Sequence, residues 1–310
     1  MTTRLTNLTR PVPGTDHESP TRHGRVGFVL ALAGLMLATA SLIANLVAAG
    51  LVGDGETDRA DQTLAWSFGL NTAAFGTIKL GIAIVLIGIL VRLWLRVESV
   101  KDSLPHLKAP AEPTVEAGSI TTPFGPATSS RDIPKPLPIH TIAKRMWGPM
   151  LAMGYMAVLA GLVVSFVWAG DPASVAPASW AQGLQFLGEG LLLAGISFLL
   201  GTILAALREG GGEVQAAVGV TVKTLKMPKT AKVFVALMAL GVMVSVLQFV
   251  LYLVVANGVE NPAAWFAWLG PLREVGLGLI LSGIVTALVT IGNVLGFQFD
   301  RINEIVTTGN

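Results

Sequence analysis

The chain has 310 residues, of which 52% are hydrophobic and only 13% are charged, and its mean hydropathy is +0.66. Soluble domains carry about 25% charged residues, so this is the composition of a membrane protein. There are no cysteines, which excludes disulfides, thiolate metal sites and cysteine nucleophiles.

Six apolar runs follow a polar segment at the start of the chain. Residues 1–25 contain three prolines among charged and hydroxyl residues, and we expect them to form a flexible cytoplasmic tail. Each run is close to or above the ~20 residues that cross a bilayer as a helix. A helix satisfies its own backbone hydrogen bonds, which lipid cannot do, so the sequence predicts an all-α membrane protein with six transmembrane helices. The expected spans are 26–50, 74–97, 148–169, 184–207, 232–256 and 272–297.

The spans are predicted to form three helical hairpins separated by polar segments. The hairpins occupy residues 26–97, 147–207 and 232–299, and the connections and tail occupy 98–146, 208–231 and 300–310. Residues 98–146 hold eight prolines and few large apolar side chains, so we expect an extended linker, or a segment that lies over a partner subunit. Residues 208–231 interleave apolar residues with lysines, which favours a short segment held at the membrane surface by anionic headgroups.

Basic residues predict the orientation. Of the 21 arginines and lysines, 18 fall on the side of the two termini, and only Arg59, Lys79 and Arg273 fall on the other. Cytoplasmic loops carry the excess of positive charge, so we expect a plasma (inner) membrane protein with both termini in the cytoplasm. The sequence pI near 9.0 reflects this distribution rather than one basic patch, so no nucleic-acid partner is expected.

Glycines predict a weak internal repeat. An ungapped match of the second helix of each hairpin aligns Gly81, Gly188 and Gly276, and seven residues later Gly88, Gly195 and Gly283. Seven residues are nearly two helical turns, so each pair of glycines lies on one stripe, where small residues let helix backbones approach closely. The first helices align more weakly, through Gly34, Gly154 and Gly241.

Polar residues in the outer half of the spans form the one candidate site. The alignment places Lys79, Phe186 and Glu274 in one column, with Glu189 three residues deeper. A charge inside the bilayer costs at least ~2.5 kcal/mol and normally has a partner or a water-filled neighbour. One interpretation is a polar pocket that opens outward; the other is a buried Lys79–Glu189 or Lys79–Glu274 bridge that holds the repeats together. The cluster comprises Asn45, Lys79, Glu189, Gln248, Tyr252 and Glu274.

Signals for catalysis or cofactor binding are weak. All four histidines lie in polar segments, so haem ligation between helices is not expected. Four methionines between Met146 and Met156 share a helix face, but methionine at this spacing is more typical of packing than of a copper site. We therefore expect no catalytic residue, cofactor or metal site.

Two functions remain after this search. The first is a non-catalytic subunit that packs against other integral membrane subunits of a larger complex. The second is a small transporter or channel that uses the polar cluster at the interface between repeats. A membrane enzyme acting on lipid is a weaker third hypothesis.

Overall fold

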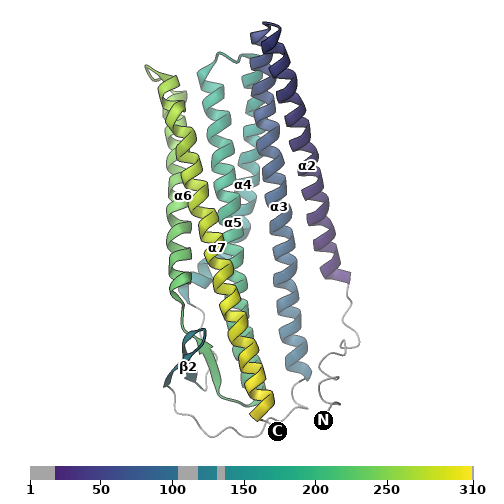
Figure 1. Ribbon diagram of the computed structural model, residues 1–310, viewed down its shortest axis with the longest axis vertical. Helices are drawn as coiled ribbons and strands as arrows, with labels where there is room; N and C mark the ends of the chain where they lie inside the picture. The colour runs from purple at the N-terminus through teal and green to yellow at the C-terminus, as the bar shows by residue number, and fades with distance from the viewer. Residues whose placement is uncertain (1–17, 104–117, 131–136, 309–310) are drawn as a thin grey trace.

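The computed structural model describes residues 18–103, 118–130 and 137–308, which form a bundle of long antiparallel helices with a small sheet at one end (Figure 1). Within these residues, six helices are long and apolar enough to cross a membrane, which confirms the predicted number and type of the candidate spans. The elements in chain order are α2 (Glu18–Gly53), α3 (Thr57–Ser103), β1 (Gly118–Thr122), β2 (Gly125–Ser130), α4 (Pro138–Gly170), α5 (Val175–Val218), β3 (Val222–Leu225), α6 (Lys229–Ala256) and α7 (Pro262–Thr308).

The two ends of the bundle differ. Three short connections, residues 54–56, 171–174 and 257–261, lie together at one end, which we call the turn end (Figure 1). The three strands and the last turns of α7 lie at the opposite end, which we call the sheet end.

Helix α5 is the centre of the bundle. It packs against α3, α4, α6 and α7, whereas α2 packs against α3 alone among the described helices. In the most apolar stretch of α5, 72% of the residues are buried, against 17% in α2. Polar side chains on α5 are therefore the ones most in need of partners from other helices.

Consecutive helices approach each other through small residues. A Cβ added to Gly154 of α4 would lie 2.9 Å from the carbonyl oxygen of Gly188 on α5. Gly241 of α6 has the same relation to the carbonyl oxygen of Gly276 on α7, also at 2.9 Å. On α2, a Cβ added to Gly34 would lie 2.7 Å from the carbonyl oxygen of Ala74 on α3. Larger side chains at these glycines would force the backbones apart.

These contacts show that the two glycine alignments disagree in the first helix pair. Gly34 meets Ala74 rather than Gly81, whereas Gly81 meets Gly27, seven residues earlier on α2. The column through Gly34 and the column through Gly81 therefore cannot both hold. Small residues recur every seven positions along these helices, so an ungapped match on glycines fits equally well one heptad out of register.

All six of the glycines that the sequence marked for packing face the first helix of their own pair. Gly81 faces Gly27, Gly88 faces His23, Gly188 faces Gly154, Gly195 faces Leu151, Gly276 faces Val244, and Gly283 faces Met238.

A three-stranded antiparallel sheet replaces part of the linker expected at residues 98–146. Helix α3 continues to Ser103, β1 and β2 form a hairpin, and β2 pairs with β3. Ala127 of β2 and Leu225 of β3 form a buried cluster with Val294 and Phe297 of α7. The segment has few apolar residues of its own, but it folds because β3 and α7 supply the rest of a core. Residues 104–117 and 131–136 of the expected linker lie outside the described residues.

The expected surface segment at residues 208–231 also folds differently. Helix α5 runs on through three consecutive glycines to Val218 and ends at Gly219, whose φ of +81° is the left-handed conformation that favours glycine at a helix C-terminus. The glycines stay helical because neighbouring helices fit against them: Gly210 packs against Val97 of α3, and Gly211 packs against Gln298 of α7. Val222 and Leu225 are buried in protein rather than at a lipid surface.

Candidate functional site

Three charged side chains from three helices meet at the centre of the bundle. The Glu189 carboxylate on α5 lies 3.2 Å from Nζ of Lys79 on α3, through Oε1. Its other oxygen, Oε2, accepts a hydrogen bond of 2.7 Å from Nη2 of Arg273 on α7. The Glu189 side chain is 2% exposed, and the Lys79 and Arg273 side chains are 16% and 26% exposed. We call these three residues the charge triad.

The burial of Glu189 follows from the small residues on either side of it. Gly188 lies against Gly154 and Val158 of α4, and Gly190 lies against Ser245 of α6, so two helices close over α5 at this level. A carboxylate enclosed in this way keeps its charge only if cations and hydrogen-bond donors replace the water it has lost. The two cations provide this, one to each oxygen.

Arg273 is the member of the triad that sequence reasoning placed elsewhere. It is the second residue of the expected sixth span, on the side opposite the termini, and the predicted polar cluster does not include it. In the structure α7 begins at Pro262 and continues through Pro271, so Arg273 lies in the fourth turn of the helix. Its guanidinium stacks 4.2 Å from the centroid of the Phe186 ring on α5. The signal that could have found it was Glu189 itself, because a buried carboxylate needs cations from facing helices.

An aromatic and amide layer lies between the triad and the turn end. Tyr252 of α6 is buried, its ring is 5.6 Å from that of Phe186, and its hydroxyl donates a 3.2 Å hydrogen bond to Gln182 of α5. Gln248 is also buried and donates a 2.9 Å hydrogen bond to the carbonyl oxygen of Leu269 on α7. Both residues, named from the sequence, therefore hold α6 to its neighbours on the side of the triad that faces the turn end.

The remaining two candidates lie outside this group. Glu274 is 73% exposed, and its carboxylate is 3.7 Å from the Arg273 guanidinium. The Glu274–Arg273 pair contributes little to stability because the Glu274 side chain is exposed. Asn45 of α2 lines a separate cleft at the turn end, about 520 Å³ in volume, between α2, α3 and the connection from α4 to α5. That cleft is also lined by Ser41, Asp61, Ser67, Asn71 and Trp168.

The triad carries two positive charges and one negative charge, and both carboxylate oxygens are occupied. This arrangement ties α3, α5 and α7 together at one level, and it favours the interpretation of a structural bridge over that of an open polar pocket. The bridge joins three residues rather than the two that the sequence predicted, because Arg273 as well as Lys79 pairs with Glu189. Within residues 18–103, 118–130 and 137–308, no three histidine, aspartate or glutamate side chains gather where a metal ion could bind.

No protein-family model, curated protein or solved structure matches this chain.

Proposed function

We propose that this chain is a non-catalytic integral membrane subunit that packs against a larger membrane protein complex. The observation that carries the proposal is an unfilled seam on α7. Gly278, Ser282, Val285, Val289 and Gly292 recur at alternating spacings of four and three residues, and we call them the α7 seam. A spacing of 3.5 residues is typical of a stripe that faces another helix.

The α7 seam is open in the isolated chain. A Cβ added at Gly278 or Gly292 would meet nothing within 4 Å, in contrast with Gly276, which lies 2.9 Å from Val244 of α6. Ser282, Val285 and Val289 are exposed. Inside a bilayer, small residues and a hydroxyl on one stripe favour close approach by a foreign helix, because packing replaces the hydrophobic drive that lipid removes.

We further infer that the chain is built from three helical hairpins related by a weak internal repeat. The support is the shared geometry of Gly34, Gly154 and Gly241: a Cβ added to each would lie 2.7 to 2.9 Å from a carbonyl oxygen of the partner helix. The contact four positions beyond each carbonyl also matches: Ile78 packs on Gly34, Leu192 on Gly154 and Ile280 on Gly241. A plasma (inner) membrane location with both termini in the cytoplasm belongs to the same proposal.

The test of the subunit hypothesis is extraction of the tagged chain from its native membrane in mild detergent. We expect a particle much larger than 32.4 kDa that contains other polypeptides. Gly278→Leu should release those polypeptides and leave the chain folded. Gly148→Leu is the matched control, because Gly148 on α4 also has open space around it but lies off the seam. A lone, stable monomer from the wild-type membrane would refute the proposal.

A second candidate function is a small transporter or channel. The observation that favours it is the 520 Å³ cleft at the turn end, where hydroxyl, amide and carboxylate groups line one wall. Proteoliposome uptake of labelled amino acids and alkali cations is the test, with Asp61→Asn as the cleft variant and Glu189→Gln as the triad variant. Flux that neither change alters would remove the support for this function.

A further inference from the structure

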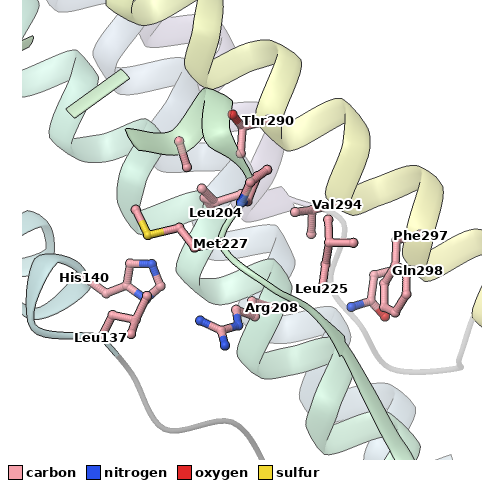
Figure 2. A pocket seen from close by; sticks show the side chains of 12 residues that line it. Leu137, His140, Leu204, Arg208, Leu225, Met227, Thr290, Val294, Phe297 and Gln298 are labelled. Atoms are coloured by element: carbon pink, nitrogen blue, oxygen red, sulfur yellow. The ribbon is translucent and has the colours of Figure 1, made fainter. Parts of the chain in front are cut away.

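A shallow cavity at the sheet end is lined by both apolar and basic side chains (Figure 2). It lies among the start of α4, the sheet-end parts of α5 and α7, Leu225 of β3 and the segment that joins β3 to α6. Figure 2 shows the Arg208 guanidinium on the side of the cavity toward Leu137 and His140. The cavity volume is about 40 Å³, which is room for roughly three water-sized groups such as the oxygen atoms of a phosphate.

Two polar atoms at this cavity lack partners. Nε of Arg208 and Nδ1 of His140 are buried and make no hydrogen bond within the described residues. A buried donor without an acceptor costs about 1–3 kcal/mol, and more if it is charged. Nε of Arg208 is always a donor, and Nδ1 of His140 is a donor in one tautomer of the neutral ring, so both atoms can serve an acceptor that comes from outside the chain.

Two helix N-termini meet at the same place. Helix α4 begins after Leu137 and helix α6 begins after Pro228, and neither of these residues caps its helix with a side-chain hydrogen bond. Both residues line the cavity. Pro138 at the start of α4 has no N–H, and the N–H groups of His140 and Ala231 bond to the carbonyl oxygens of Leu137 and Pro228. The two helix ends therefore attract an anion mainly through the positive ends of their dipoles, which add to the charge of Arg208.

An apolar groove continues from the cavity toward the middle of the bundle. A second shallow cavity shares His140, Leu204, Met227 and Ala231 with the first and extends past Phe198, Phe234 and Met238. Helices α4 and α6 each contact α5 but do not contact each other, so α5 forms the floor of this groove. The groove runs along the bundle, parallel to the direction that an acyl chain takes in a leaflet.

We propose that this site binds one anionic phospholipid from the leaflet at the sheet end. Arg208, His140 and the two helix N-termini hold the phosphate, and one acyl chain lies in the groove between α4 and α6. The pairing of a positive cavity with an apolar groove selects an amphiphile over a free anion. The lipid also closes a gap that the protein leaves between its second and third helix pairs.

The test is native mass spectrometry of the full-length protein in detergent, titrated with phosphatidylglycerol, phosphatidylcholine or inorganic phosphate. We expect one phosphatidylglycerol to bind at least tenfold more tightly than phosphatidylcholine, and Arg208→Gln to weaken that binding about five- to tenfold. Lys232→Gln is the matched control, because Lys232 is exposed near the start of α6 and lines neither cavity. It should change the affinity less than twofold.

A second variant tests the groove independently of the charge. A Cβ added to Gly201 would lie 3.4 Å from Ala143 Cβ and 4.0 Å from Phe234 Cε1, so Gly201→Val places methyl groups in the groove with little displacement of the helices. It should weaken phosphatidylglycerol binding and leave the thermal unfolding temperature without lipid unchanged. Equal binding of the two lipids, or full affinity in Arg208→Gln, would overturn the proposal. Inorganic phosphate that displaces phosphatidylglycerol at equal concentration would overturn the part played by the acyl chain.

Discussion

Each carboxylate oxygen of Glu189 pairs with a cation from a different helix. Removing Glu189 should therefore change the free energy of unfolding by a different amount from removing one of the cations. Glu189→Gln leaves Lys79 and Arg273 facing each other with no buried anion between them. Lys79→Met leaves a balanced pair between Arg273 and Glu189. We therefore expect Glu189→Gln to lower the free energy of unfolding by about 3 kcal/mol, near the lower end for a broken buried pair because the cations are partly exposed. Lys79→Met should cost clearly less.

The measurement for the triad is unfolding in detergent followed by tryptophan fluorescence, with Glu274→Gln as the control. Glu274 is 73% exposed and pairs only loosely with Arg273, so this change should alter stability by less than about 0.5 kcal/mol. If Lys79→Met lowered the free energy of unfolding as much as Glu189→Gln, the stabilising effect of the triad would not come from balancing buried charges.

Arg301 has the corresponding role at the sheet end. Its side chain is 2% exposed, and it donates hydrogen bonds to the carbonyl oxygen of Thr221 and to Oε1 of Gln215, at 2.9 and 3.2 Å. It also forms a 2.8 Å ion pair with Glu304. Lysine keeps the charge but lacks the planar fork that reaches several acceptors, so we expect Arg301→Lys to cost about 2 kcal/mol.

Local opening of β3 would distinguish the effect of Arg301→Lys from a loss of stability in the whole bundle. Gln215 accepts a hydrogen bond from the backbone N–H of Lys223, so the arginine supports β3 through that glutamine. Faster amide hydrogen exchange in β3 of Arg301→Lys, with unchanged exchange in the middle of α5, is the expected result. Arg59→Lys, at an exposed pair with Glu56, is the control and should change neither. Exchange in β3 at the wild-type rate would contradict the assignment.

At the scale of the helix, the same amino acid has opposite roles on two faces of the bundle. A Cβ at Gly188 would lie 2.7 Å from the carbonyl oxygen of Gly154 and 2.8 Å from the backbone nitrogen of Val158, and neither atom can move without the helix. We expect Gly188→Ala to lower the free energy of unfolding by about 1–3 kcal/mol. Gly278→Ala meets open space and should be neutral or slightly stabilising, because alanine favours the helix. Equal effects in the same unfolding assay would mean that these helices do not pack at the distances described.

Hydropathy was sufficient to predict the spans and insufficient to predict where the helices end. An apolar run of ~20 residues has no stable alternative to a helix in lipid, so the runs could be located from sequence alone. Outside the hydrocarbon region a helix continues for as long as neighbours cover it, and that depends on tertiary contacts such as Gln298 against Gly211. The hairpin at residues 118–130 could not be predicted for the same reason, because three of the four buried residues of its core come from β3 and α7.

For the candidate site, too, the sequence predicts which residues matter but not how they pair in the folded chain. Glu189 and Lys79 could be selected because any charge within a span requires an explanation. Their pairing through opposite oxygens, and the presence of Arg273, depend on how three helices are rotated about their axes. A glycine pattern that repeats every seven residues specifies neither that rotation nor the depth of one helix against another, because seven residues are nearly two whole turns.

For the molecule as a whole, the absence of cysteine makes the proposed orientation directly testable. Asp54 and Glu260 are exposed at the turn end, in two different connections, and Thr121 is exposed on β1 at the sheet end. Each can be replaced singly by cysteine and treated with a membrane-impermeant maleimide in intact cells and again after permeabilisation. None of the three side chains takes part in the triad or the sheet core, so the fold should survive each change.

The distribution of positive charge determines the expected labelling. Because 18 of the 21 basic residues lie on the side of the termini, the sheet end should face the cytoplasm. Asp54→Cys and Glu260→Cys should then react in intact cells, and Thr121→Cys should react only after permeabilisation. The reverse pattern would refute the orientation and leave the helix count intact. Labelling of Asp54→Cys and Glu260→Cys from opposite sides would refute the crossing of the membrane by every helix between them, because four crossings must return the chain to the side from which it started.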